Sequence, residues 1–126
     1  MLSSAAALRG SAYVANYAAT KAYNLILAEG LWDELREHGI DVLGFMPGIT
    51  ITPAFEQSKP KLEKRMKVVP IMEAGPTVAE ALEALGKRPS HVAGRMNRFN
   101  MFMSSKLIPR KTAVKLVGKQ MRDLYG

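Results

Sequence analysis

The sequence predicts an α/β protein built on part of a parallel β-sheet. Three observations support this: a long helical pattern over residues 12–38, the short apolar run 40–46 directly after it, and a weaker strand-like segment at 90–94. An apolar run closed by Pro47-Gly48 is typical of a strand buried on both faces, and such strands usually belong to parallel sheets. A helix that leads through a short turn into such a strand is half of a β-α-β unit.

The helical pattern over residues 12–38 comes from apolar residues spaced three or four positions apart. They are Ala18, Ala22, Leu25, Ile26, Trp32 and Leu35. Charged residues gather toward the end of the pattern, and Gly39 is the residue type that most often ends a helix. Small residues in this segment permit close packing of another helix.

The second half of the chain predicts further helices. Residues 49–70 read as a loop that becomes charged, and Thr77 to Glu80 has the form of a capping box. We expect Thr77 to begin a helix and Glu80 to reach back to the Thr77 amide, with Gly86 just past the helix end. From Arg95 onward the pattern is amphipathic and basic, with an interruption at Pro109.

Composition excludes several classes of protein. The chain has 126 residues, 48% of them apolar and 23% charged, which favours one folded domain over disorder. With no cysteine, it has no disulfide, thiolate metal site or cysteine nucleophile, and it is compatible with a reducing cytosol. His38 and His91 lie far apart without an acidic cluster, so no metal site is expected.

The net charge of +7 resides mainly near the C-terminus. No nucleic-acid partner is expected, because the basic residues are not part of a recognisable reading motif. Lysines and apolar residues occupy different faces of the predicted last helix: Lys111, Lys115 and Lys119 on one, Val114, Val117, Met121 and Leu124 on another. Such a helix packs its apolar side on its own domain, or lies on an anionic membrane. We expect packing, and keep peripheral membrane contact through residues 99–124 as the alternative.

Targeting and membrane-spanning segments are not expected. The opening residues lack the basic region and the continuous apolar core of a targeting peptide. No apolar run reaches the length of a membrane span. We therefore expect a cytoplasmic protein.

Tyr17 and Lys21 form a Tyr-x-x-x-Lys motif, which places a phenol and an ammonium one helical turn apart. A phenol ordinarily titrates near 10, too high for proton exchange at neutral pH. An ammonium about 4 Å away favours the phenolate by about 4 kcal/mol at an effective dielectric of 20, and desolvation opposes this. We interpret Tyr17 as an acid/base and Lys21 as its tuning charge. Tyr13 and Tyr23 lack a cation four positions on and are interpreted as packing residues.

Several motifs occur in one order along the chain. Ser4 stands thirteen positions before Tyr17; the apolar strand follows the helix, and Pro47-Gly48 then leads to Thr52. This order resembles the short-chain dehydrogenase/reductase family, closely over residues 2–52 and loosely beyond. The resemblance implies the C-terminal half of a Rossmann-like doubly wound parallel sheet. That half, rich in helices, covers residues 1–94, and residues 95–126 form a basic helical extension.

The resemblance also implies roles for individual residues. The reaction would be reduction or oxidation of a carbonyl or alcohol with NAD or NADP. Tyr17 would be the acid/base, Lys21 would also bond the nicotinamide ribose, and Ser4 would orient the carbonyl, with Ser3 as a substitute. The expected cofactor contacts are Tyr17, Lys21, Pro47, Gly48, Ile49 and Thr52.

Parts of the family pattern are absent from the sequence. There is no G-x-G-x-x-G turn to hold a pyrophosphate at a helix N-terminus, no residue that selects NAD or NADP, and no relay asparagine. We therefore expect the catalytic half of an oxidoreductase, inactive on its own. The resemblance also implies a homo-oligomer that pairs through the helix of residues 12–38. A rival is a non-catalytic module that associates through the same residues or binds a membrane surface.

The segment after Thr52 is the expected cover of the substrate. Its apolar residues are Phe55, Met66, Val68, Val69, Ile71 and Met72. As a lid they favour a lipophilic carbonyl or alcohol, and otherwise they are the anchors of an exposed linker.

Overall fold

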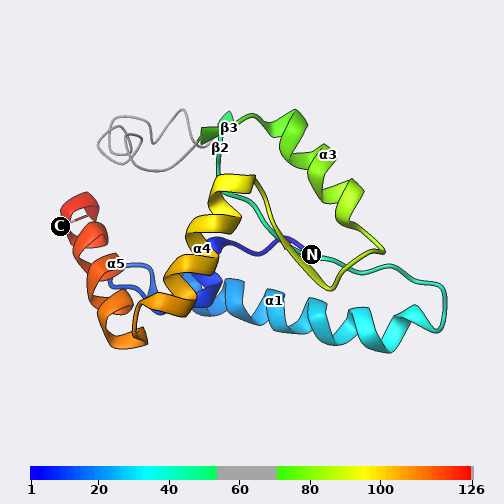
Figure 1. The fold of residues 1–126 in the computed structure, drawn as a ribbon, viewed down its shortest axis with the longest axis horizontal. Helices are drawn as coiled ribbons and strands as arrows, with labels where there is room; N and C mark the ends of the chain where they lie inside the picture. The colour runs from blue at the N-terminus through cyan, green and yellow to red at the C-terminus, as the bar shows by residue number, and fades with distance from the viewer. Residues whose placement is uncertain (54–70, 126) are drawn as a thin grey trace.

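The structure, a computed structural model, describes residues 1–53 and 71–125 (Figure 1). Its elements in chain order are the 3-10 helix η1 (Ala5–Leu8), helix α1 (Ala15–Arg36), strands β1 (Gly44–Met46), β2 (Ile49–Thr50) and β3 (Ile71–Met72), helix α3 (Ala74–Ala84), strand β4 (Ser90–Val92), and helices α4 (Arg95–Leu107) and α5 (Arg110–Tyr125). Four of the six expected lid residues, Phe55, Met66, Val68 and Val69, lie outside the described residues.

The strands pair in parallel, as predicted. β1 lies beside β4, with Phe45 opposite His91, and Leu2 forms a parallel bridge with Phe45 on the other side. The order across this sheet is therefore the N-terminal residues, β1 and then β4. β2 and β3 form a second parallel pair. The central strand is shorter than the predicted run 40–46, because regular pairing begins only at Gly44.

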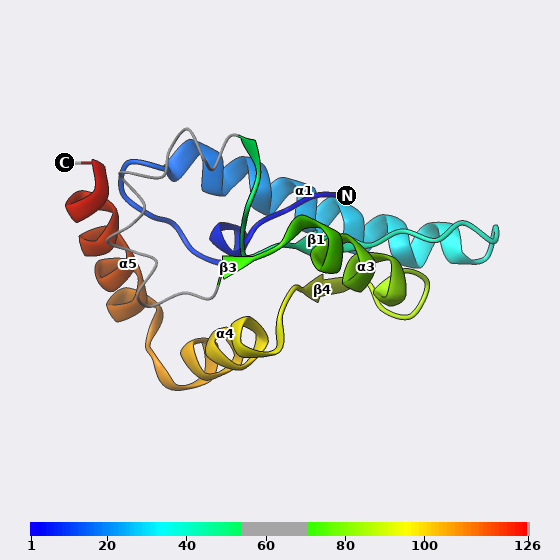
Figure 2. The same cartoon turned by 90° about the horizontal axis from the view of Figure 1, so that it is seen from above.

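Helices cover both faces of the sheet (Figure 2). On one face Leu25 and Ala28 of α1 are buried beneath Gly44 of β1. On the other, Phe45 belongs to a buried cluster with Leu43, Ala93 and Ala84 of α3. This layering explains why β1 is buried along its whole length, and it is the arrangement of a doubly wound α/β fold.

The long helix is confirmed with slightly different ends, since α1 spans Ala15–Arg36. The Ile40 amide bonds the Leu35 carbonyl and the Gly39 amide bonds the Arg36 carbonyl, which is the Schellman pattern. That pattern requires a left-handed residue, and Gly39 has a φ of 70°. The predicted role of Gly39 as the helix stop is therefore confirmed.

The predicted capping box is wrong. α3 begins at Ala74, and Thr77 lies inside it with its hydroxyl donating to the Glu73 carbonyl at 2.6 Å. Pro76 does not prevent this early start, because first-turn amides have no partner within the helix. The Glu80 carboxylate turns away to bond residues of β4 and α4 instead.

The basic C-terminal region forms two helices separated at Pro109, as predicted. α5 packs part of its apolar side, since Ala113 and Met121 are buried. In the described ranges no helix is both long and apolar enough to cross a membrane.

Candidate active site

The N-terminal strand is held on both sides. Toward β1, the Ser3 amide donates to the Phe45 carbonyl at 2.7 Å and the Phe45 amide donates to the Met1 carbonyl at 2.9 Å. The Leu2 carbonyl accepts from Lys21 Nζ at 3.2 Å and from Asn24 Nδ2 at 3.3 Å, both on α1. The strand is therefore fixed against the helix that carries the Tyr-x-x-x-Lys motif.

Tyr17 and Lys21 lie on the same side of α1. The Lys21 Nζ is 5.6 Å from the centre of the Tyr17 ring, and 49% of Tyr17 is exposed, so its phenol is accessible. Asn24 continues the same helical face at i+7 from Tyr17. Sequence reasoning missed Asn24, although this spacing was a readable signal.

The two serines have different environments. Ser3 is buried at 2% exposure, and its hydroxyl donates to the Lys21 carbonyl at 2.7 Å. Ser4 is half-buried and caps η1, where its Oγ accepts from the Ala6 amide at 3.2 Å. A hydroxyl that accepts in this way keeps its hydrogen to donate elsewhere. Ser3 is thus committed to the fold, and Ser4 is the better candidate to polarise a substrate.

The Pro47-Gly48 turn joins β1 to β2 and is supported from behind by α4. A Cβ on Gly48 would lie 2.4 Å from Asn97 Nδ2, so a larger residue does not fit unless the Asn97 side chain moves. Asn97 is itself held by a bond to the Ala93 carbonyl at 3.0 Å. Sequence reasoning missed Asn97, because nothing local links it to a turn 49 positions earlier.

The other expected cofactor residues follow this turn. Ile49 pairs with Ile71 of β3, and Thr50 donates from its hydroxyl to the Gly48 carbonyl at 3.2 Å. Thr52 is exposed just after β2. The structure therefore places the expected nicotinamide contacts on one continuous segment at the end of β1.

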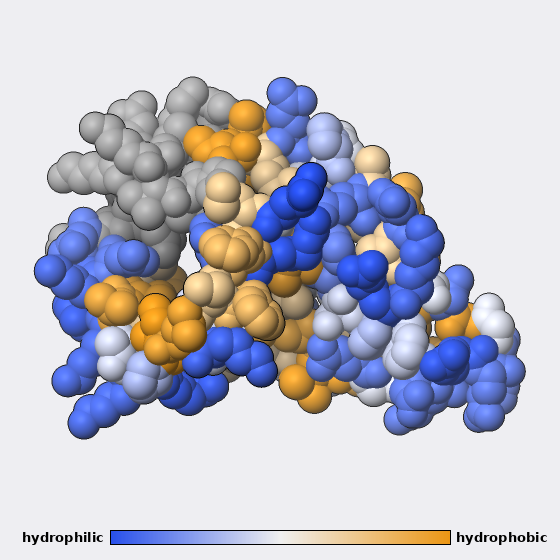
Figure 3. Space-filling view, in the orientation of Figure 1, coloured by the Kyte–Doolittle hydropathy of each residue, from blue (hydrophilic) through white to orange (hydrophobic). Residues whose placement is uncertain are grey.

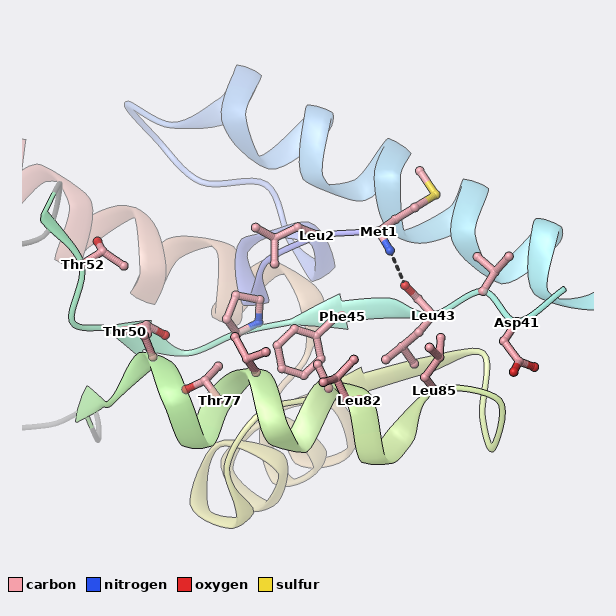
Figure 4. Close-up of a pocket in the computed structure, with 15 residues that line it drawn as sticks. Met1, Leu2, Asp41, Leu43, Phe45, Thr50, Thr52, Thr77, Leu82 and Leu85 are labelled. Carbon is pink, nitrogen blue, oxygen red and sulfur yellow. Dashed lines mark hydrogen bonds between the residues drawn. The ribbon is translucent and has the colours of Figure 1, made fainter.

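A groove of about 720 Å³ lies between α3 and the first two strands (Figure 4). Leu82 and Leu85 line its helical side, Leu2 and Phe45 its strand side, and Thr52 lies toward one end. The lining does not include Ser4, Tyr17 or Lys21. The groove is mainly apolar, and its lining includes Pro47 and Thr52 of the expected cofactor residues.

A second polar cluster joins α3, β4 and α4. Glu80 accepts from His91 Nε2 at 2.9 Å, from the Gly94 amide at 2.9 Å and from Arg98. Burial raises the pKa of Glu80, but the bonds from His91, Gly94 and Arg98, together with the Arg98 charge, outweigh burial and leave that pKa below its ordinary value. Arg98 also donates to the Val92 carbonyl at 2.9 Å. The cluster therefore fixes the start of α4, which carries Asn97.

Two expectations about tyrosines are wrong. Tyr13 is 63% exposed and Tyr23 is 66% exposed, so neither packs in the core. Tyr13 has a φ of 64° in the turn before α1, and Tyr23 points outward from the helix. Among the described residues, no three His, Asp or Glu side chains gather to hold a metal ion.

A parallel sheet covered on both faces, with a serine-bearing strand bonded to a Tyr-x-x-x-Lys helix, is an arrangement typical of the Rossmann-like dehydrogenase fold. The chain belongs to the short chain dehydrogenase family, whose sequence profile matches residues 1–63.

Two comparisons with individual proteins agree. The chain is 35% identical over 89 residues to a 7beta-hydroxysteroid dehydrogenase of Clostridium sardiniense, in a match that covers 71% of this chain and 33% of that protein. It also resembles a solved structure from work on 7beta-hydroxysteroid dehydrogenase stereoselectivity, with a TM-score of 0.81 and 28% identity. That match covers 93% of this chain and 46% of the other. The chain thus spans between a third and a half of the relatives that it matches.

The Glu80 cluster predicts a pH-dependent contribution to stability. Because the folded pKa of Glu80 lies below 4.5, its contribution is present above that pH and is lost as the pH falls through the folded value. Glu80→Gln should lower the free energy of unfolding by about 1 to 3 kcal/mol at neutral pH. The difference from the wild type should shrink in acid.

Urea unfolding of both proteins between neutral and acid pH measures this difference. The control is Glu83→Gln on the same helix, an exposed site where the change should stay within about 0.5 kcal/mol. If Glu80→Gln lowers the free energy of unfolding by the same amount at every pH, that result would contradict a stabilising role of the charged Glu80 carboxylate.

Proposed function

We propose that the chain carries the proton-transfer half of an NAD(P)-dependent oxidoreductase that interconverts a carbonyl and an alcohol. The observation that carries this proposal is the Tyr17–Lys21 pair. Both side chains lie on one side of α1, and Lys21 is bonded to the strand that leads directly into Ser4. An acid, a cation and a hydroxyl donor are thereby held on neighbouring elements, which is what carbonyl chemistry requires.

Reduction of a carbonyl adds a hydride at carbon and a proton at oxygen. A nicotinamide cofactor supplies the hydride when bound. On the oxygen side, the Tyr17 phenol gives its proton to the developing alkoxide while the Ser4 hydroxyl donates a hydrogen bond to the same oxygen. The Lys21 ammonium beside the ring stabilises the phenolate left behind. In oxidation the phenolate takes the proton of the alcohol.

The residues present fit the nicotinamide end of such a cofactor. The bond to Leu2 uses one of the three donors of the Lys21 ammonium, and the others suit ribose hydroxyls. Asn97 fixes the Pro47-Gly48 turn from behind, which presents the backbone at Ile49 and the nearby Thr52 to a carboxamide. We propose NAD or NADP without preference, since no residue that selects between them is present in the sequence.

We propose a lipophilic substrate. The Clostridium relative is a hydroxysteroid dehydrogenase, and a hydroxysteroid is a lipophilic alcohol. The segment that follows Thr52 is rich in apolar residues, and two of them, Ile71 and Met72, form β3 next to the turn. A cover of this composition favours a water-excluding pocket over a charged one.

We propose that the chain acts together with a nucleotide-binding half of the same fold. Successive backbone groups along a strand point to opposite sides, so the Leu2 amide and carbonyl face away from β1. The carbonyl accepts from Lys21 and Asn24, so the amide is the group that this edge offers to another strand. The apolar groove beside this edge offers Leu82 and Leu85 as packing surface (Figure 4). The two observations together suit the remainder of a doubly wound sheet.

The isolated chain of 126 residues should not bind a dinucleotide tightly. The sequence has no glycine-rich turn to bond the pyrophosphate, and the nicotinamide end supplies only part of the contacts. Isothermal titration calorimetry with NADH and NADPH should show no binding in the micromolar range. A micromolar Kd for either cofactor would overturn the proposal that a second half is needed.

We also propose a homo-oligomer formed through residues 12–38, in a cytoplasmic protein. Tyr23 and Ile26 project from α1 with 66% exposure each, so the helix keeps an apolar surface outside its own core. This surface also favours the rival reading, a non-catalytic association module. A variant that loses catalysis but still associates distinguishes the catalytic function from association.

Tyr17→Phe, in the chain complemented with a nucleotide-binding half, should lower kcat about 100- to 10,000-fold because the general acid is removed. The matched control is Tyr23→Phe on the same helix, which should leave kcat unchanged. Steady-state reduction of a ketosteroid measures kcat. Size-exclusion chromatography should give the same oligomer for both variants. An unchanged kcat in Tyr17→Phe would contradict Tyr17 as the general acid. A complemented wild type that forms the oligomer but has no measurable kcat would favour the association module.

A further inference from the structure

The net charge of the molecule is confined to its last quarter. Residues 95–126 contain eight Lys and Arg and a single acid, Asp123, so they carry the entire net charge of +7. Residues 1–94 hold equal numbers of basic and acidic side chains. A neutral sheet-bearing part is therefore joined to a strongly cationic pair of helices.

α4 does not bury its apolar side chains. None of its residues is buried, and Met96, Phe99 and Phe102 are 57%, 59% and 60% exposed. Their spacing of three positions keeps them together along the helix, and we call them the α4 stripe. Figure 3 shows apolar side chains gathered over α4 with hydrophilic ones around them. A helix in a globular protein ordinarily buries such a stripe, so its exposure indicates a binding surface.

α5 follows α4 directly and supplies positive charge. Its Ala113 and Met121 are buried, which orients the helix, while Lys111, Lys115 and Lys119 are exposed at intervals of four. Lys106 and Arg110, at the junction of the two helices, are exposed as well. The apolar stripe and the cations therefore belong to one contiguous helical pair.

We propose that α4 and α5 dock on an anionic membrane surface, with the α4 stripe in the headgroup region and the α5 lysines against the lipid charges. Aromatic and Met side chains beside a basic helix are the combination that binds such interfaces. A second copy of this chain is a poorer occupant, because it would bring an equal cluster of positive charge to the contact. This inference does not depend on the oxidoreductase function.

Vesicle flotation of the purified chain tests the proposal. The chain should float with vesicles of phosphatidylcholine and phosphatidylglycerol and stay behind with phosphatidylcholine alone. Raising the salt from about 0.1 M to 1 M, which shortens the Debye length from about 10 to 3 Å, should release it. The double variant Phe99→Ser with Phe102→Ser should bind at least about tenfold more weakly, since two large apolar side chains are removed.

The matched control is Ile40→Ser, which removes an apolar side chain of 51% exposure from the loop before β1. It should float as the wild type does. Circular dichroism should be the same for all three proteins, because the substituted side chains are exposed. The proposal is overturned by equal binding to neutral vesicles, by no flotation, or by an unchanged Phe99/Phe102 variant. A dimer that this variant converts to monomer, without flotation, would assign the stripe to a second copy.

Discussion

Three hydrogen bonds join α1 to the N-terminal strand. Lys21 and Asn24 donate to the Leu2 carbonyl, and the Ser3 hydroxyl donates to the Lys21 carbonyl. These bonds join the helix to the sheet at the point where the candidate chemistry lies. Ser4 and Tyr17 are thirteen positions apart in the sequence, and these bonds help to fix one relative to the other. We call these three hydrogen bonds the seam between α1 and the N-terminal strand. The arrangement of the site depends on this seam more than on the Tyr-x-x-x-Lys spacing alone.

The Lys21 side chain makes two contacts. Its ammonium bonds the strand and at the same time lies beside the Tyr17 ring. The bond to the Leu2 carbonyl therefore holds the ammonium on the side of α1 that carries Tyr17. The Pro47-Gly48 turn is fixed by comparable means, with Asn97 packed behind it and α4 anchored through Glu80.

Much of the local structure could be predicted because its causes are local. Gly39 ends α1 through its own left-handed conformation, and Gly44–Met46, at the end of the apolar run, forms a buried strand. The partners of Glu80 were not predictable, because they lie 11 to 18 positions away and outcompete the nearby Thr77 amide. The support of Gly48 by Asn97 and the exposure of α4 likewise depend on how distant elements pack.

Native-state hydrogen exchange at the Ser3 amide tests the seam most directly. This amide donates to the Phe45 carbonyl, and Lys21 donates to the Leu2 carbonyl of the same strand. The Ser3 amide should therefore be protected nearly as well as the Leu25 amide inside α1. Lys21→Met should speed its exchange by about tenfold or more, with a smaller effect at Leu25. A Ser3 amide that exchanges at the unprotected rate in the wild type would contradict this view of the site.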